Sequence, residues 1–131
     1  MKILVIDDDH LVRYTLSKIL RAHGHEVCLA ADGARGTELM SAERPELVIT
    51  DIIMPEQEGF ETIVQIRRDC ERVKIIAISG GFRSGNLDVL SMAHSLGADD
   101  VLAKPFEEDD LMRAVDRVVR SSPISSLMDA D

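Results

Sequence analysis

Short apolar runs alternate along the chain with longer amphipathic segments. The runs cover residues 3–6, 27–30, 47–50, 73–78 and 101–103, which are lengths typical of strands. Apolar residues recur at helical spacing over residues 11–20, 33–42, 58–68, 87–96 and 107–120. Because the strand-like runs are apolar at successive positions, both of their faces are expected to be buried, which is typical of a sheet covered by helices on both sides.

This alternation predicts the fold class. Parallel neighbouring strands need crossover connections, which are usually helices and are right-handed. We therefore expect an α/β fold, in which five helices doubly wind a five-stranded parallel sheet. Residues 1–120 are predicted to form this single domain, since their number suits one hydrophobic core. Residues 121–131 are rich in serine, contain Pro123 and lack periodicity, so we expect a flexible tail or the start of a linker there.

Composition narrows the classes of function. Hydrophobic residues make up 45% of the 131 residues and charged residues 30%, which indicates a folded protein. The net charge of -9 argues against direct binding of nucleic acid by this domain, because such binding depends on cations. No apolar run is long enough to cross a bilayer, and the N-terminus lacks the layout of a signal peptide. We therefore expect a cytoplasmic domain that binds no membrane.

Acidic residues stand at the ends of two predicted strands. Asp7 and Asp8 follow the first run, and Asp51 follows the third. Open α/β sheets place their ligands at the carboxyl ends of their strands. Taken alone, Asp51 is as typical of a turn before Pro55 as of a site. The second acidic strand end favours the site.

Asp7, Asp8 and Asp51 would converge if the first and third strands are neighbours. Three carboxylates that close together repel one another, so a cation is then expected beside them. Mg²⁺ suits this set, because it takes one or two carboxylates, keeps several waters and binds phosphate. The backbone carbonyl of Ile53 is a candidate for a further ligand. The four histidines are scattered along the chain, which argues against a zinc site.

A hydroxyl and a cation stand at the ends of the fourth and fifth predicted strands. Ser79 ends the fourth run, where its hydroxyl serves either a bound oxygen or a turn hydrogen bond. Lys104 follows the fifth run and offers phosphate a compact point charge. Pro105 can fix the loop that aims this lysine, including through a cis peptide bond. Four suitable groups at four strand ends indicate a phosphoryl-acceptor site with Asp51 as the nucleophile.

With these residues, the chain resembles the receiver domain of two-component response regulators, a family that includes the chemotaxis response regulators. The resemblance covers about residues 1–120 and implies a flavodoxin-like (βα)5 fold with strand order 2-1-3-4-5. The residues that carry the resemblance are Asp7 and Asp8, Asp51 with Met54 and Pro55, Ser79 with Gly80, and the run Lys104, Pro105 and Phe106.

The resemblance implies a signalling module rather than a metabolic enzyme. A sensor histidine kinase or a histidine phosphotransfer protein would donate a phosphoryl group to Asp51. Mg²⁺ would be held at Asp7 and Asp8, Lys104 would contact the phosphoryl group, and Ser79 would be the switch hydroxyl. The domain would remove its phosphoryl group slowly by its own reaction with water. Output would pass through the face formed by the fourth helix, the fifth strand and the fifth helix.

Other functions remain open from the residues alone. One alternative is a small Mg²⁺-dependent phosphatase or phosphotransferase with an aspartate nucleophile, although no cap segment is evident. A receiver kept as an unphosphorylated scaffold is another. A dinucleotide- or flavin-binding module is a weak third, since the loop after the first strand lacks the glycine fingerprint.

Three positions depart from the pattern of the resembled family. Val101 stands where many receivers carry a switch tyrosine or phenylalanine, so no ring can report phosphorylation there. Ile53, two residues after Asp51, would shield the phosphoryl group and slow its hydrolysis. The segment of residues 80–86 is a few residues longer than usual and contains several glycines.

Overall fold

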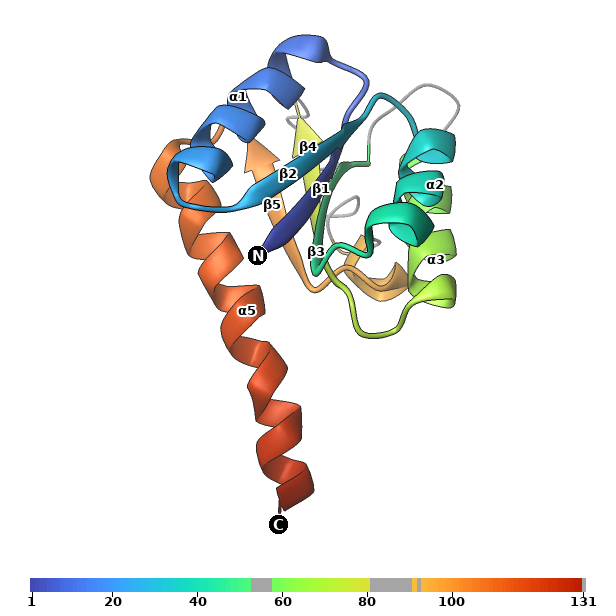
Figure 1. The fold of residues 1–131 in the computed structure, drawn as a ribbon, viewed down its shortest axis with the longest axis vertical. Coiled ribbons are helices and arrows are strands. Elements are labelled where there is room, and N and C mark those ends of the chain that lie inside the picture. The colour runs from blue at the N-terminus through green and yellow to red at the C-terminus, as the bar shows by residue number, and fades with distance from the viewer. Residues whose placement is uncertain (53–57, 81–90, 92, 131) are drawn as a thin grey trace.

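The computed structural model describes the chain except for residues 53–57, 81–90, 92 and 131. Five strands form one parallel sheet in the order β2-β1-β3-β4-β5 (Figure 1). This order confirms the prediction of a parallel sheet of the flavodoxin-like kind. The strands are β1 (Lys2–Ile6), β2 (Glu26–Ala30), β3 (Leu47–Asp51), β4 (Lys74–Gly80) and β5 (Asp100–Lys104).

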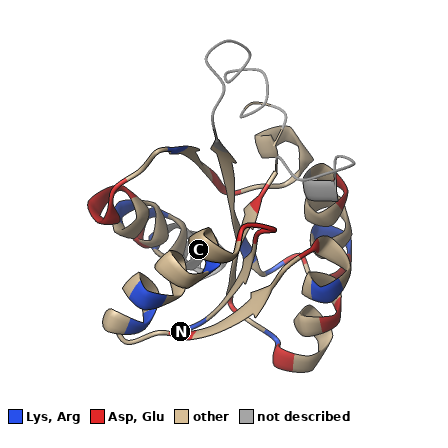
Figure 2. Ribbon diagram, turned by 90° about the horizontal axis from the view of Figure 1, so that it is seen from above, with Lys and Arg blue, Asp and Glu red and all other residues tan. Residues whose placement is uncertain are grey.

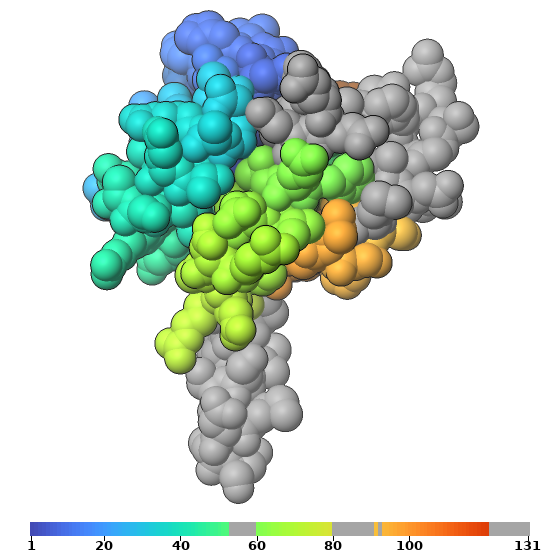
Figure 3. Space-filling model, turned by 90° about the vertical axis from the view of Figure 1, so that its right-hand side faces the viewer, coloured from blue at the N-terminus to red at the C-terminus, as the bar shows by residue number. Residues whose placement is uncertain are grey.

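Helices cover both faces of the sheet, as the alternating pattern predicts. One face carries α1 and α5, and the other carries α2 and α3, which lie side by side (Figures 1 and 3). Residues 91 and 93–96 are also helical and are the described part of the predicted fourth helix. The bounds of the other helices are α1 (His10–Ala22), α2 (Gly33–Glu43), α3 (Glu58–Asp69) and α5 (Glu108–Ala130).

The core consists of two layers, because successive side chains of a strand point to opposite faces. In β1, Ile3 and Val5 pack with the buried residues of α1 and α5. Leu4 and Ile6 pack with those of α2 and α3 on the other face. All four side chains are buried. Side chains at successive positions of β1 are thus apolar because helices cover both faces of the sheet, as expected from the sequence.

The N-terminus of α1 resolves an alternative that the sequence leaves open. Either Asp8 or Asp9 can cap this helix. In the structure, Asp9 is the cap, and its Oδ1 accepts a hydrogen bond from the backbone N–H of Leu11 at 2.9 Å. Asp8 is therefore left available at the end of β1.

The last helix is longer than the sequence pattern predicts. The expected end near Arg120 is wrong, because α5 continues through Pro123 to Ala130. A proline removes one N–H donor and crowds the carbonyl four residues before it, which bends a helix without always ending it. Figure 1 shows the last turns of α5 projecting beyond the sheet. The division into a domain of residues 1–120 and a tail stays a prediction.

A hydrogen-bonded cluster fixes the amino-end edge of the sheet. Arg67, in the last turn of α3, donates to the backbone carbonyls of Glu71, Val73 and Gly97 and to the carboxylate of Asp99. Gly97 has φ +127, and a Cβ atom there would lie 3.2 Å from the Cγ of Arg67. Glycine is therefore required at this turn both for its backbone conformation and for the close approach of the arginine.

Candidate functional site

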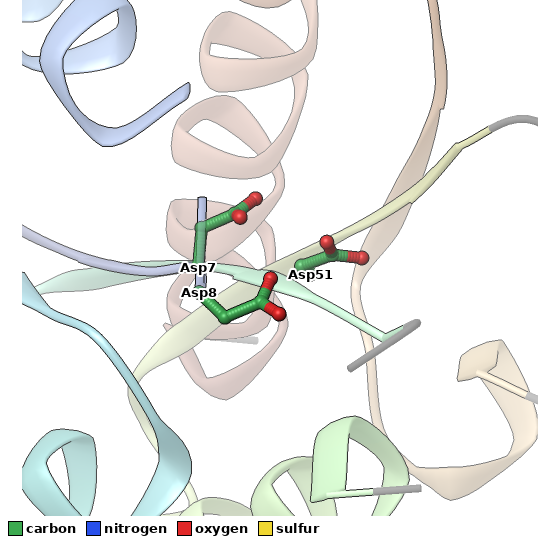
Figure 4. A group of neighbouring side chains, drawn as sticks. All are labelled: Asp7, Asp8 and Asp51. Carbon is green, nitrogen blue, oxygen red and sulfur yellow. The ribbon is translucent and has the colours of Figure 1, made fainter. Parts of the chain in front are cut away.

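Three carboxylates meet at the carboxyl-end edge of the sheet (Figure 4). Asp7 and Asp8 directly follow β1, and Asp51 ends the neighbouring strand β3. One carboxylate oxygen from each residue lies within 4.8 Å of the others. Asp7 is 1% exposed and Asp51 5%, whereas Asp8 is exposed. Figure 2, which views the molecule from this edge, shows acidic segments near its centre.

Lys104 reaches this carboxylate cluster from the edge strand β5. Its Nζ lies 3.4 Å from Oδ2 of Asp7 and 3.4 Å from Oδ2 of Asp51. The Lys104–Pro105 peptide bond is cis, in agreement with the sequence-based expectation. The structure thus brings the lysine at the end of the fifth strand to the carboxylates at the ends of the first and third strands, across the intervening β4.

Ser79 occupies β4, between the strands that supply Asp51 and Lys104. Its side chain is 3% exposed. Among the described residues, its Oγ is the buried side-chain atom that has no hydrogen-bond partner. A buried hydroxyl without a partner costs about 1–3 kcal/mol relative to a satisfied one. The turn hydrogen bond weighed from the sequence is therefore not formed within the described structure, and the hydroxyl is available to a ligand.

Burial and charge crowding raise the pKa of Asp7 to about 6. Burial is the largest cause, and the nearby Asp51 carboxylate adds to it. Two contacts act in the opposite direction, namely the backbone N–H of Asp9, 2.8 Å from Oδ1, and the Lys104 ammonium. Because the net pKa remains well above the usual range of aspartate, the single lysine does not offset the negative charge of the cluster.

The pKa of Lys104 is raised by the same arrangement. Burial alone lowers it, but the carboxylates of Asp51 and Asp7 outweigh burial. The lysine therefore keeps its positive charge throughout the neutral pH range. One lysine does not balance two carboxylates. A further anionic group is therefore expected to bind here only together with additional positive charge.

The carboxylate cluster fits a hard divalent cation. Its three residues offer oxygen atoms, which are the ligands that such cations prefer. Their close spacing and the raised pKa of Asp7 indicate an excess of negative charge that a cation would relieve. The further ligand predicted from the sequence, the carbonyl of Ile53, lies outside the described residues.

Sequence reasoning missed one residue that supports this edge. The guanidinium of Arg13, in the first turns of α1, donates from Nη1 to the backbone carbonyl of Asp7 at 2.7 Å. This bond ties the helix to the turn that carries the acidic pair. The available signal is the spacing, since residue 13 lies one helical turn after the capping residue Asp9.

Comparison with known protein families identifies the family of this chain. The family described as response regulator receiver domain matches residues 3–116. The chain belongs to this family. A receiver is the phosphoryl-accepting module of two-component signalling, so the resemblance noted from the sequence is confirmed and the function class with it.

Similar proteins include single-domain and longer regulators. Protein PilH of Pseudomonas aeruginosa is 33% identical over 118 residues, which are 90% of this chain and 97% of PilH. Sporulation initiation phosphotransferase F of Bacillus subtilis is 31% identical over 114 residues, 87% of this chain and 90% of that protein. The response regulator MprA of Mycolicibacterium vanbaalenii is 33% identical over 124 residues, 92% of this chain but only 51% of MprA.

Solved structures agree with the receiver fold. A response regulator receiver domain protein from Clostridium thermocellum superposes with a TM-score of 0.84 at 28% identity, covering 94% of this chain and 97% of that one. The chemotaxis protein CheY4 of Vibrio cholerae gives a TM-score of 0.80 at 28% identity, covering 89% and 97%. Within the described part of this receiver, no helix combines the length and apolar character that a membrane span requires.

The positions that depart from the family pattern have different outcomes. Val101 lies in β5, half-buried against the core layer of α2 and α3, and carries no ring. The effect of this substitution on switching stays a prediction. Ile53 and most of the segment of residues 80–86 lie outside the described residues.

Proposed function

We propose that this receiver accepts a phosphoryl group on Asp51 from the phosphohistidine of a sensor histidine kinase or a histidine phosphotransfer protein. The observation that carries the proposal is the convergence of a buried aspartate, two further carboxylates and a lysine at one edge of the sheet. The hydroxyl of Ser79, which has no hydrogen-bond partner among the described residues, lies near the end of β4, between the strands of Asp51 and Lys104. These groups match the needs of a phosphoryl group in transfer, which requires a nucleophile in line and positive charge around its oxygens.

In the proposed reaction, a carboxylate oxygen of Asp51 attacks phosphorus as the bond between phosphorus and the histidine nitrogen breaks. The electron pair of that bond stays on the imidazole nitrogen. The other ring nitrogen of the phosphohistidine carries a proton, so that a neutral imidazole leaves. The product is an acyl phosphate on Asp51. Lys104 is placed to neutralise charge on the phosphoryl oxygens, and Ser79 is placed to donate a hydrogen bond to one of them.

We propose Mg²⁺ as the cation of the site. Asp7, Asp8 and Asp51 would hold it, together with the carbonyl of Ile53 as predicted from the sequence. When bound, Mg²⁺ supplies positive charge that offsets the carboxylates and the incoming phosphoryl group. Its removal leaves Lys104 as the one cation 3.4 Å from both Asp7 and Asp51 in the described structure, so phosphoryl acceptance is expected to depend on the metal.

We propose that the output face is formed by the fourth helix, β5 and α5. Phosphorylation acts through Lys104 and Ser79, which belong to β5 and β4, so the strands that bind the phosphoryl group also border this face. A longer regulator such as MprA carries further sequence beyond its receiver, and a downstream domain or protein is the expected reader. A shift from 1:99 to 99:1 between two states requires about 5.5 kcal/mol of differential binding.

The test is the intact mass of the protein after incubation with Mg²⁺ and acetyl phosphate. We expect the mass to increase by one phosphoryl group in the parent protein and not in Asp51→Asn. Addition of EDTA before the donor should prevent the increase. If Asp51→Asn gains the same mass, another residue is the acceptor and the assignment of Asp51 is wrong.

A second assay separates the receiver from the alternative of a metabolite phosphatase. The purified protein is incubated with Mg²⁺ and a small phosphate monoester, and released phosphate is measured. We expect at most one equivalent per protein molecule, because no segment that could cap a small substrate is evident in the sequence. Sustained turnover would favour the phosphatase. If neither donor leaves a phosphoryl group, beryllofluoride binding distinguishes a receiver that needs its own kinase from a scaffold.

A further inference from the structure

A groove lies along α1 and the edge strand β2, apart from the phosphoacceptor site. Its volume is about 480 Å³, and α1 supplies all of its lining except Leu29 of β2. Two of its large apolar side chains are open to solvent, since Tyr14 of α1 is 53% exposed and Leu29 of β2 is 36% exposed. Strands β2 and β5 are the two edge strands of the sheet, so the strand of the groove and the strand of the proposed output face lie at opposite edges.

The charge of this α1/β2 groove is opposite to that of the whole chain. The chain carries a net charge of -9, yet the lining contains Arg13, Lys18 and Arg21 and no acidic residue. None of these three cations forms an ion pair within the described structure. Other cations are paired in the same structure, as Arg117 is with Asp100 at 2.8 Å and Lys2 with Glu43 at 3.1 Å.

The three cations are held in place by other contacts. Arg21 donates to the backbone carbonyl of Val27 at 3.1 Å, and Arg13 donates to that of Asp7 at 2.7 Å. The ammonium of Lys18 lies 5.7 Å from the centre of the Tyr14 ring, within cation–π range. Each cation therefore keeps hydrogen-bond donors for a partner while its side chain is already partly ordered, which reduces the entropy lost on binding.

The features of the groove favour a protein segment over other occupants. Sites for small molecules enclose most of their ligand, whereas here the apolar side chains are half-exposed. Nucleic acid is disfavoured by the acidic surface of the rest of the chain. An exposed apolar floor bordered by unpaired cations fits a segment that combines an apolar anchor with carboxylates.

We propose that the α1/β2 groove is a docking site for an acidic segment of a partner protein. In this arrangement an apolar side chain of the partner packs between Tyr14 and Leu29, and its carboxylates pair with Lys18, Arg21 and Arg13. Because Arg13 also contacts the carbonyl of Asp7, the groove borders the turn that carries the acidic pair. The surface is distinct from both the phosphoacceptor site and the proposed output face.

The experiment selects twelve-residue peptides from a random phage-displayed library on the immobilised full chain, and measures their affinity by fluorescence polarisation. We expect selected peptides to combine Asp or Glu residues with at least one large apolar residue. Lys18→Glu and Tyr14→Ser should each weaken binding at least tenfold. The matched control is Arg68→Glu, which makes the same charge change at an exposed position of α3. It should bind within twofold of the parent.

Two measurements need no variant of the protein. Replacing the acidic residues of a selected peptide by Asn and Gln should weaken its binding at least tenfold, and raising the salt from 50 to 300 mM should weaken it several-fold. The proposal is overturned if no peptide is selected, if the selected peptides are neutral or basic, or if Lys18→Glu binds like the parent. It is also overturned if a twelve-nucleotide oligo-dT displaces the peptide at equal concentration. Phosphoryl uptake from acetyl phosphate should be unchanged in Lys18→Glu, which separates this proposal from that for Asp51.

Discussion

The edge of the sheet at which the strands begin and the edge at which they end hold charged side chains in contrasting ways. At the amino-end edge, Arg67 makes five hydrogen bonds of 2.7–3.2 Å to three backbone carbonyls and one carboxylate. That carboxylate, Asp99, also accepts from the backbone N–H of Ile75 at 2.8 Å. At the carboxyl-end edge, Lys104 reaches two carboxylates only at 3.4 Å, and the Ser79 hydroxyl has no partner in the described structure.

The difference shows which edge is built for stability and which for a ligand. Buried charges stabilise a fold only when their hydrogen bonds are complete, because desolvation otherwise outweighs attraction. The Arg67 cluster meets this condition within the chain. In the cluster of Asp7, Asp8 and Asp51, the raised pKa of Asp7 indicates an excess of negative charge, which a cation from outside the chain would offset. Changes at the two edges should therefore separate stability from phosphoryl acceptance.

The largest effect on stability is expected for Arg67→Ala. This change removes the guanidinium from the carbonyl of Gly97 and from Asp99, which keeps the backbone N–H of Ile75 as a donor. It should lower the free energy of unfolding by about 2–4 kcal/mol. Urea denaturation measures this. The neighbouring Arg68→Ala, at an exposed position, should change it by less than about 0.5 kcal/mol. The contrast between the edges fails if folded Arg67→Ala no longer takes up phosphoryl from acetyl phosphate.

Mg²⁺ should stabilise the protein through the opposite edge. At a concentration one hundred times its dissociation constant, a ligand that binds only the folded state adds about 2.7 kcal/mol. Thermal denaturation with and without Mg²⁺ measures the gain, which should be lost in Asp51→Asn and kept in Arg67→Ala. An equal gain in Asp51→Asn would place the metal elsewhere.

A smaller effect on the free energy of unfolding, opposite in sign to that of Arg67→Ala, is expected for Asp7→Asn in EDTA. The pKa of Asp7 is raised to about 6 in the folded state, so the folded protein binds this proton more tightly than the unfolded chain. The resulting stability is present below about pH 4 and is lost as the pH rises through about 6. At pH 7, Asp7→Asn should therefore be more stable than the parent by about 1–3 kcal/mol.

Measurements at several pH values provide the control for Asp7→Asn. The stability difference between Asp7→Asn and the parent should be small near pH 4 and should grow towards pH 7, as followed by urea denaturation at each pH. A difference that does not change with pH would mean that the variant acts through packing and not through the charge of Asp7.

The smallest effect on stability is expected for Ser79→Ala. The Oγ of Ser79 has no hydrogen bond to lose in the described structure, so the free energy of unfolding should change by less than about 1 kcal/mol. The rate of phosphoryl uptake, measured by intact mass over time, should nevertheless fall. Loss of more than 2 kcal/mol with an unchanged rate would show that the hydroxyl is structural.

Most of the fold could be predicted from the sequence because its signals are local. Continuous apolar runs fixed the five strands, and period-3.6 patterns fixed the helices that cover them. The predicted end of α5 near Arg120 was wrong because α5 continues past Pro123, since a proline can bend a helix without ending it. The choice of Asp9 over Asp8 as the cap of α1 could not be made, since both residue types cap equally well.

For the candidate site, the sequence by itself determined the residue types and the strand ends that carry them, namely Asp7, Asp8, Asp51, Ser79 and Lys104. The tertiary structure decided that Lys104 reaches both buried carboxylates and that Arg13 supports the carbonyl of Asp7. It also left the Ser79 hydroxyl without a partner among the described residues. It further decided that three cations of α1 lie beside Leu29 and form no ion pair with any other described residue. The physical reason is that charge pairing and hydrogen bonding depend on distances of a few ångströms between residues far apart in the chain, which no local pattern of apolar and polar residues records.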